Sequence, residues 1–91
     1  MTILYSSEFE KKLKKIKRSD PNKLKTIIRK IQFFSQNPQY PSLKLHKLGG
    51  VLKEYYSFSV SPNLRIIFSW KDLDTVLFYT IGTHDEVYKQ N

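Results

Sequence analysis

The run Leu64-Arg65-Ile66-Ile67-Phe68-Ser69-Trp70 carries apolar side chains at both its odd and its even positions. Successive side chains of a strand point to opposite faces, so this pattern indicates a strand that is largely covered on both faces. Its β-branched and aromatic residues also favour an extended backbone. The run therefore predicts a central β-strand over residues 64–70, with Arg65 as a charged residue near its start.

Two further strands are predicted on either side of this run. Residues 53–60 and 75–82 are rich in aromatic and β-branched residues, which are typical of strands. The connecting residues 61–63 and 71–74 are few enough for antiparallel hairpins, and Gly82 ends the last strand. The three segments together predict consecutive antiparallel strands.

The N-terminal half predicts a short strand and two helices. The first helix begins at a serine cap after a strand over residues 3–5, and it ends near Ser19. The second helix has Asp20 as its N-cap and Pro21 as its first residue, and Asn37-Pro38 ends it. Each helix carries an apolar stripe at helical spacing. The stripes comprise Phe9, Leu13 and Ile16 in the first helix, and Leu24, Ile27, Ile28, Ile31 and Phe34 in the second.

The order of these elements predicts an α+β fold. Residues 38–51 contain prolines and glycines and are expected to form an ordered loop between the two halves. The series β-α-α-β-β-β then places a two-helix hairpin on one face of a small antiparallel sheet, and the open face carries the site. Ninety-one residues without a long polar linker predict a single domain over residues 1–91.

Charge and composition narrow the classes of function. The net charge is +8, and residues 1–35 hold ten of the sixteen basic residues but three of the eight acidic ones. Such a balance favours a polyanionic partner: nucleic acid, an acidic membrane surface or an acidic protein. The chain has no cysteine and no apolar run long enough to span a bilayer. We therefore expect a soluble protein of the cytoplasm, with no membrane association.

The sequence lacks the usual motifs of metal-dependent and cofactor-dependent enzymes. It has no Gly-rich phosphate loop, no His-x-x-x-His and no carboxylate cluster for Mg²⁺, so we expect no metal and no cofactor. RNA can still be cleaved without a metal, when its own 2′-hydroxyl attacks the adjacent phosphate and side chains supply protons and positive charge. The two histidines, His46 and His84, border the predicted sheet, and Arg65 lies within it. The three side chains could converge on the open face.

Each of these residues also has a structural interpretation. An isolated histidine in a loop is usually a surface residue or a hydrogen-bonding partner. Arg65 could pair with Glu54 across adjacent strands. Tyr88 could anchor the C-terminal tail by hydrophobic packing. The residues considered one by one leave these alternatives open.

Residues 45–88 resemble the C-terminal half of the RelE/YafQ-type toxins of the RelE/ParE superfamily. The terminal Gly82-Thr83-His84 is typical of the YafQ branch, and the N-terminal half matches in its β-α-α pattern and in residues 9–13. The matching pieces are, in order, Leu45-His46-Lys47-Leu48-Gly49-Gly50, Leu52-Lys53-Glu54-Tyr55-Tyr56-Ser57-Phe58-Ser59-Val60, Asn63-Leu64-Arg65-Ile66-Ile67-Phe68 and Ile81-Gly82-Thr83-His84-Asp85-Glu86-Val87-Tyr88.

The resemblance implies the toxin of a type II toxin–antitoxin system. Such a toxin is an mRNA interferase, an endoribonuclease that cuts mRNA in the ribosomal A site and is silenced by a cognate antitoxin. We expect it to be a monomer when free and to form a heteromeric complex with that antitoxin. The cations of the helical hairpin would suit the phosphates of ribosomal RNA.

The resemblance also implies roles for individual residues. His84 would be the general acid toward the leaving oxygen, and His46 would assist as the base. Arg65 would stabilise the charge of the transition state, and Tyr88 would lie close to the scissile phosphate. The basic positions near the RNA path are Lys44, Lys47 and Lys53.

Three positions depart from the pattern of the YafQ branch. Ser59 and Asn63 stand where that branch tends to have a histidine and an aspartate, and Leu64 stands where it has an aromatic residue. Two other functions therefore stay open. One is a ParE-like inhibitor of DNA gyrase without nuclease chemistry, although such chains usually lack the Gly-Thr-His…Tyr ending. The other is a catalytically inert relative that binds only an antitoxin.

Overall fold

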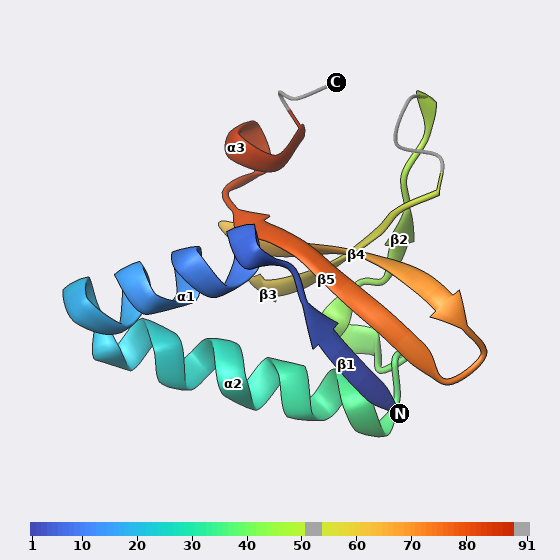
Figure 1. Ribbon diagram of the computed structural model, residues 1–91, viewed down its shortest axis with the longest axis horizontal. Helices are drawn as coiled ribbons and strands as arrows, with labels where there is room; N and C mark the ends of the chain where they lie inside the picture. Colours follow the sequence, from blue (N-terminus) through green and yellow to red (C-terminus); the bar gives the residue numbers. More distant parts are fainter. Residues whose placement is uncertain (51–53, 89–91) are drawn as a thin grey trace.

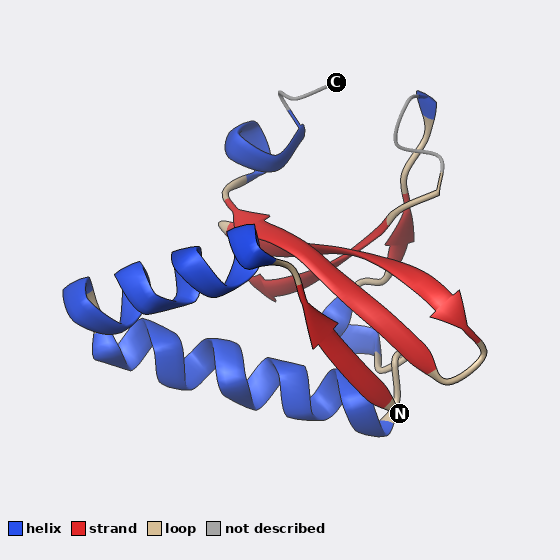
Figure 2. Ribbon diagram, viewed as in Figure 1, coloured by secondary structure: helices blue, strands red, loops and turns tan. Residues whose placement is uncertain are grey.

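Two long helices pack on one face of a five-stranded sheet (Figures 1 and 2). The computed structural model describes residues 1–50 and 54–88, so Lys53, one of the predicted RNA-binding residues, lies outside the described residues. The elements are, in chain order, β1 (Thr2–Tyr5), α1 (Ser7–Ser19), α2 (Pro21–Gln36), the short 3-10 helix η1 (Pro41–Leu43), β2 (His46–Lys47), β3 (Tyr56–Ser61), β4 (Leu64–Asp72), β5 (Thr75–Gly82) and α3 (His84–Tyr88).

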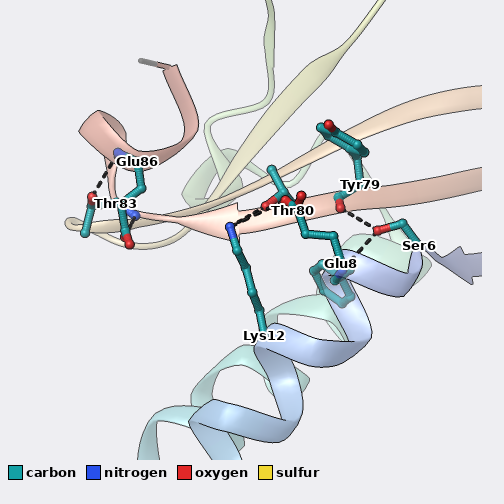
Figure 3. Close-up of polar contacts among 8 residues, drawn as sticks. Ser6, Glu8, Lys12, Tyr79, Thr80, Thr83 and Glu86 are labelled. Carbon is teal, nitrogen blue, oxygen red and sulfur yellow. Dashed lines mark hydrogen bonds and ion pairs between the residues drawn. The ribbon is translucent and has the colours of Figure 1, made fainter. Parts of the chain in front are cut away.

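Both long helices begin at the caps that the sequence predicts. The Ser6 hydroxyl accepts a hydrogen bond from the Phe9 N–H at 3.0 Å, and the Asp20 carboxylate accepts one from the Lys23 N–H at 3.1 Å. The Ser6 hydroxyl also donates to the carbonyl of Tyr79 in β5 (Figure 3). The cap of α1 therefore fixes the start of that helix against the sheet.

The sheet has the order β1-β5-β4-β3-β2, with β4 at its centre as predicted. The pairs β3–β4 and β4–β5 are antiparallel, but β1 lies parallel to β5, so the sheet is mixed and the expectation of a purely antiparallel sheet is corrected. The direction of β1 follows from its exit into α1. The Ser6 N–H donates to the Phe78 carbonyl at 2.9 Å, so β1 must run toward the same end of the sheet as β5.

The segment between α2 and β3 is more ordered than a plain loop. Residues 41–43 form η1, and the two residues of β2 pair with β3, His46 opposite Ser57 and Lys47 opposite Tyr56. The expectation that residues 38–51 hold no strand is therefore wrong at this point. A two-residue strand has too few positions for a side-chain alternation, and it forms because β3 offers an unpaired edge.

The main core lies between the helices and the sheet. Five phenylalanines are fully buried there, and the rings of Phe34 and Phe58 stack with their centroids 4.6 Å apart. Leu64, Ile66 and Phe68 of β4 belong to this core. The five are Phe9, Phe34, Phe58, Phe68 and Phe78.

The opposite face of the sheet is partly covered. Ile67 of β4 is only 2% exposed and forms a second, smaller cluster with Leu48 and with Val87 of α3. Figure 1 shows α3, and the residues that follow β2 as far as Gly50, on the side of the sheet away from α1 and α2. The run of residues 64–70 is thus covered on both faces as predicted, but the second face is not wholly open.

In the part of the chain that the structure describes, no helix has both the length and the apolar character to cross a membrane.

Candidate active site

The helix α3 begins with His84, directly after the end of β5. Thr83 caps it: the Thr83 N–H donates to the Glu86 carboxylate at 2.8 Å, and the Glu86 N–H donates back to the Thr83 hydroxyl at 3.2 Å (Figure 3). This reciprocal arrangement is a capping box. It holds His84 at the first helical position, where its side chain is 72% exposed and its Nδ1 lies 3.8 Å from Asp85 Oδ1.

Packing holds α3 on the sheet, because a helix of five residues is not stable by itself. Val87 is 2% exposed and packs in the cluster with Leu48 and Ile67. Gly82 lets α3 come close to β5, since a Cβ at that position would lie 3.1 Å from Glu86 Cβ and 3.3 Å from Val87 Cγ1. The position of His84 therefore depends on the apolar anchor and on the glycine as well as on the cap.

Glu86 keeps its negative charge in this arrangement. Its pKa is held below the ordinary value of 4.5, mainly by the hydrogen bond from the Thr83 N–H, then by the Thr83 hydroxyl, and with smaller contributions from Lys12 and Lys23. Lys12 also reaches β5, where its Nζ donates to Thr80 Oγ1 at 2.6 Å (Figure 3). The cap of α3 is thus electrostatically favoured by cations of the helical hairpin.

Arg65 lies on the face of the sheet that carries α3. It is paired with Ser59 of β3 on one side and with Gly82 of β5 on the other. Since Ile66 belongs to the helix-side core, the alternation of side chains places Arg65 on the opposite face, together with Ile67.

The predicted alternative partner of Arg65 is not found. Glu54 precedes β3, and the residue opposite Arg65 is Ser59. Among residues 1–50 and 54–88, none of the ion pairs involves Arg65, which is half-buried. Its guanidinium is therefore not committed to a carboxylate of the described chain, and it can meet an anion from outside.

His46 shares this face with Arg65 but lies at a distance. His46 is opposite Ser57, and Ser57 is opposite Ile67, two residues from Arg65. His46 is therefore two strands away from Arg65, at about 4.8 Å per strand, and two residues along the strand, at about 3.3 Å per residue. Together these displacements place the two Cα atoms about 12 Å apart. The two residues flank a common surface and do not form a pair.

The remaining predicted residues are less closely grouped. Lys47 is opposite Tyr56, whose ring packs on the main core, so Lys47 lies on the face of the sheet away from His46. Lys44 is exposed at the end of η1 with a left-handed backbone (φ 50°). Tyr88 is the last residue of α3. The structure therefore brings His84 and Arg65 to one region but separates Lys47 from it.

Two of the three departures from the family pattern, Asn63 and Ser59, border the same region. Asn63 lines a hollow together with His84, Thr83 and Pro62. Ser59 is nearly buried opposite Arg65, and its hydroxyl donates to the Ser61 carbonyl at 2.9 Å. An amide and a hydroxyl thus stand beside the candidate catalytic groups.

The sequence interpretation missed Thr83 and Glu86 as positioning residues. Their signal was present, because Thr83-His84-Asp85-Glu86 has the Thr-x-x-Glu spacing of a capping box. It also missed Lys12 and Lys23, whose nearness to α3 depends on how the helical hairpin packs. In the described ranges, no three histidines or carboxylates are grouped so that they could hold a metal ion.

A small sheet with a helical hairpin on one face and a short C-terminal helix on the other is the fold of a class of bacterial toxins. The YoeB/ParE toxin from Agrobacterium tumefaciens has this fold, with a TM-score of 0.79 at 15% identity over 92% of this chain and 99% of that one. The family described as "Bacterial toxin of type II toxin-antitoxin system, YafQ" matches residues 1–89. The chain belongs to this family and is a toxin of a type II toxin–antitoxin system.

Two further relatives support this assignment. The chain is 27% identical over 82 residues to the "Putative toxin RelE4" of Methanocaldococcus jannaschii, which covers 89% of this chain and 83% of that protein. It is also similar to a chain of the DinJ–YafQ complex of E. coli, with 28% identity and a TM-score of 0.69 over 94% of this chain and 96% of that one. The expected RelE/YafQ-type toxin is thereby confirmed.

Proposed function

We propose that this toxin is an endoribonuclease that cuts mRNA on the ribosome without a metal or cofactor. The observation that carries the proposal is the register of β4 and β5. It places Arg65 directly opposite Gly82, and Gly82 is two residues before His84. Arg65 has no carboxylate partner among the described residues. Arg65 and His84 carry a guanidinium and an imidazole, which supply the positive charge and the proton that cleavage by the 2′-hydroxyl requires.

In the proposed reaction, the 2′-oxygen of the RNA forms a bond to the adjacent phosphorus and the bond to the 5′-oxygen breaks. His46 accepts the proton of the 2′-hydroxyl, and His84 donates a proton to the leaving 5′-oxygen. Arg65 stabilises the extra negative charge on the phosphorane, and Tyr88 lies close to the scissile phosphate. The products are a 2′,3′-cyclic phosphate and a free 5′-hydroxyl, so the reaction needs no external oxidant or nucleophile.

The proposed roles of the two histidines require the RNA to lie across the face of the sheet. His46 is at the β2 edge, and α3 is at the end of β5, so a phosphate near Arg65 would sit between them. The exposed Lys44 would attract the strand on the β2 side, whereas Lys47 would act on it only at long range, from the other face of β2. We propose that Lys53 also binds the RNA. The basic outer surface of the helical hairpin would bind ribosomal RNA by contacts with phosphates. A toxin that acts on ribosomes would work in the cytoplasm, so we propose that location.

We further propose that residues 1–91 act as a single domain that is a monomer when free and binds a cognate antitoxin. The similar E. coli protein is known in a complex named DinJ–YafQ. A net charge of +8 suits an acidic antitoxin segment that folds on binding.

The proposal is tested by mapping the 3′ ends of ribosome-bound mRNA after the protein is induced in growing cells. We expect new ends within the A-site codon with the natural chain, and none with His84→Ala. Lys71→Ala is the matched control, since Lys71 is exposed in the strand end next to the β4–β5 turn and lies outside the candidate site. Cleavage that persists unchanged in His84→Ala would contradict the proposed mechanism. Inhibition of gyrase supercoiling by the purified protein, with no mRNA cleavage, would instead support the ParE-like alternative.

A further inference from the structure

Three adjacent hollows line the end of the molecule where α1 passes into α2. The first contains His84 and is bordered by Asn63 and Thr83. The second lies between α2 and the β3–β4 turn; it shares Asn63 and Thr83 with the first and adds Lys23 and Thr26. The third shares Lys23 with the second and extends along α1. Because neighbouring hollows share lining residues, they follow one another along a path that starts at His84.

We call this path the basic groove and define it by Lys15, Lys23, Thr26, Asn63 and Thr83. Within the described chain, neither Lys15 nor Lys23 takes part in an ion pair. The Glu86 carboxylate beside the groove is already bound by the Thr83 N–H and hydroxyl. The two ammonium groups are therefore available to an external anion.

The shape and the lining of the groove favour an extended polyanion. Each hollow measures between 250 and 320 Å³ and opens to solvent, so each is near or below the lower end of the range of small-molecule pockets, which is about 300–1,000 Å³. The apolar residues along it, among them Leu64 and Ile81, are at most 5% exposed, apart from the half-buried Ile16. An acidic protein segment would need exposed apolar anchors for affinity. This lining presents mainly ammonium, hydroxyl and amide groups, with Glu86 and Asp85 as its carboxylates.

We propose that the basic groove binds the phosphates of the RNA strand as it continues from the scissile phosphate near His84, with Lys15 and Lys23 as the principal contacts. The inference rests on the proposed function, since it takes RNA as the substrate of the site. It adds a second segment of the RNA path, on the helical hairpin. Neither Lys44 nor Lys47 lines this groove.

The test is an NMR titration of the full-length protein with a 2′-O-methyl oligoribonucleotide, which cannot be cleaved because the attacking oxygen is blocked. We expect the amide signals of Lys23, Asn63 and Thr83 to shift on binding. The double variant Lys15→Gln/Lys23→Gln should bind about tenfold more weakly, and the slope of log K against log salt should fall by up to about 1.4, which is about 0.7 for each lost phosphate contact.

The matched control is Lys11→Gln/Lys25→Gln, which removes the same charge from the same two helices at exposed positions outside the groove. It should change the affinity by no more than about twofold, because general attraction is reduced but no phosphate contact is lost. Equal losses in the two double variants would overturn the inference. So would shifts confined to the region of Lys44 and Lys47.

A second titration with a poly-glutamate peptide separates RNA from an acidic protein partner. Tighter binding of the peptide than of the RNA, lost in Lys15→Gln/Lys23→Gln, would overturn the inference in favour of a protein ligand. Both titrations measure binding alone, so their results do not depend on whether the protein cleaves RNA. If RNA binding depends on the groove but no mRNA is cleaved in cells, the proposed function is wrong and the inference about the groove stands. If mRNA is cleaved but RNA binding does not depend on the groove, the inference is wrong and the proposed function stands.

Discussion

Gly82 and Glu86 approach so closely that a Cβ on Gly82 would lie 3.1 Å from the Cβ of Glu86. This contact seats the first turn of α3 on the end of β5. Gly82 is also the residue opposite Arg65 in the sheet. One glycine therefore couples the strand that carries the candidate guanidinium to the helix that carries the candidate imidazole.

Replacing Gly82 by alanine should displace α3. The added methyl group meets Glu86 Cβ, which is fixed to the helix backbone, so α3 must shift by a few tenths of an ångström. We expect a destabilisation of about 1–3 kcal/mol, typical of overpacking, together with reduced toxicity. Gly49→Ala is the control, since a Cβ at Gly49 meets nothing within 4 Å. Urea unfolding and a growth assay measure both effects, and equal behaviour of the two variants would refute the role of the close approach.

Removing the guanidinium of Arg65 should abolish toxicity without unfolding the protein. Arg65 is half-buried and has no ion-pair partner among the described residues, so Arg65→Ala should cost no more than about 1 kcal/mol of stability. Arg65→Lys should recover part of the activity, because it keeps the charge but not the planar, bidentate donor. Growth of cells that overproduce each variant is the measurement. Full toxicity of Arg65→Ala, with Lys71→Ala as the reference, would exclude a role in catalysis.

The cap of α3 should weaken in acid. The pKa of Glu86 is lowered in the folded protein, so its stabilising contribution is fully present above its ordinary value of 4.5 and is lost as the pH falls through the lowered folded value. We expect the amide signal of Thr83 to move in this acidic range, because its N–H donates to the Glu86 carboxylate.

Glu86→Gln and Asp85→Asn test this assignment. A glutamine can still accept the Thr83 N–H but does not titrate, so Glu86→Gln should remove the pH dependence and keep the cap, whereas Glu86→Ala should lose the cap at every pH. Asp85→Asn should leave the titration of the Thr83 signal unchanged. If that signal titrates in Glu86→Gln as it does in the natural chain, another group is responsible.

Truncating Phe34 should be the most damaging of these changes to the fold. Its ring is fully buried and stacks on Phe58, so Phe34→Ala leaves a cavity and should cost about 3–5 kcal/mol. A loss of this size is a large share of the stability of a small domain. Ile28→Ala in the same helix is the control: Ile28 is 47% exposed, and we expect it to cost less than about 1 kcal/mol. Urea denaturation of both variants measures the loss of unfolding free energy. Equal losses in Phe34→Ala and Ile28→Ala would contradict the prediction.

The elements of this fold were predictable because their signals are local. The two-sided apolar run of β4, the cap at Asp20 with Pro21 after it, and the two short turns around β4 each depend on residues close together in the chain. The same holds for the candidate groups His84 and Arg65, whose residue types and places beside or within strands are visible without coordinates.

The pairing of distant segments was decided by the tertiary structure. The Ser6 hydroxyl donates a hydrogen bond to the carbonyl of Tyr79, 73 residues away. This contact lies where β1 pairs in parallel with β5, and no turn or residue spacing in the sequence predicts that pairing. The short β2, the packing of Val87 against Leu48, and the basic groove arise in the same way. Local backbone preferences and side-chain periodicity determine which helices and strands form. Their neighbours depend on which edges and apolar surfaces remain uncovered once those elements pack, and a linear pattern does not carry that information.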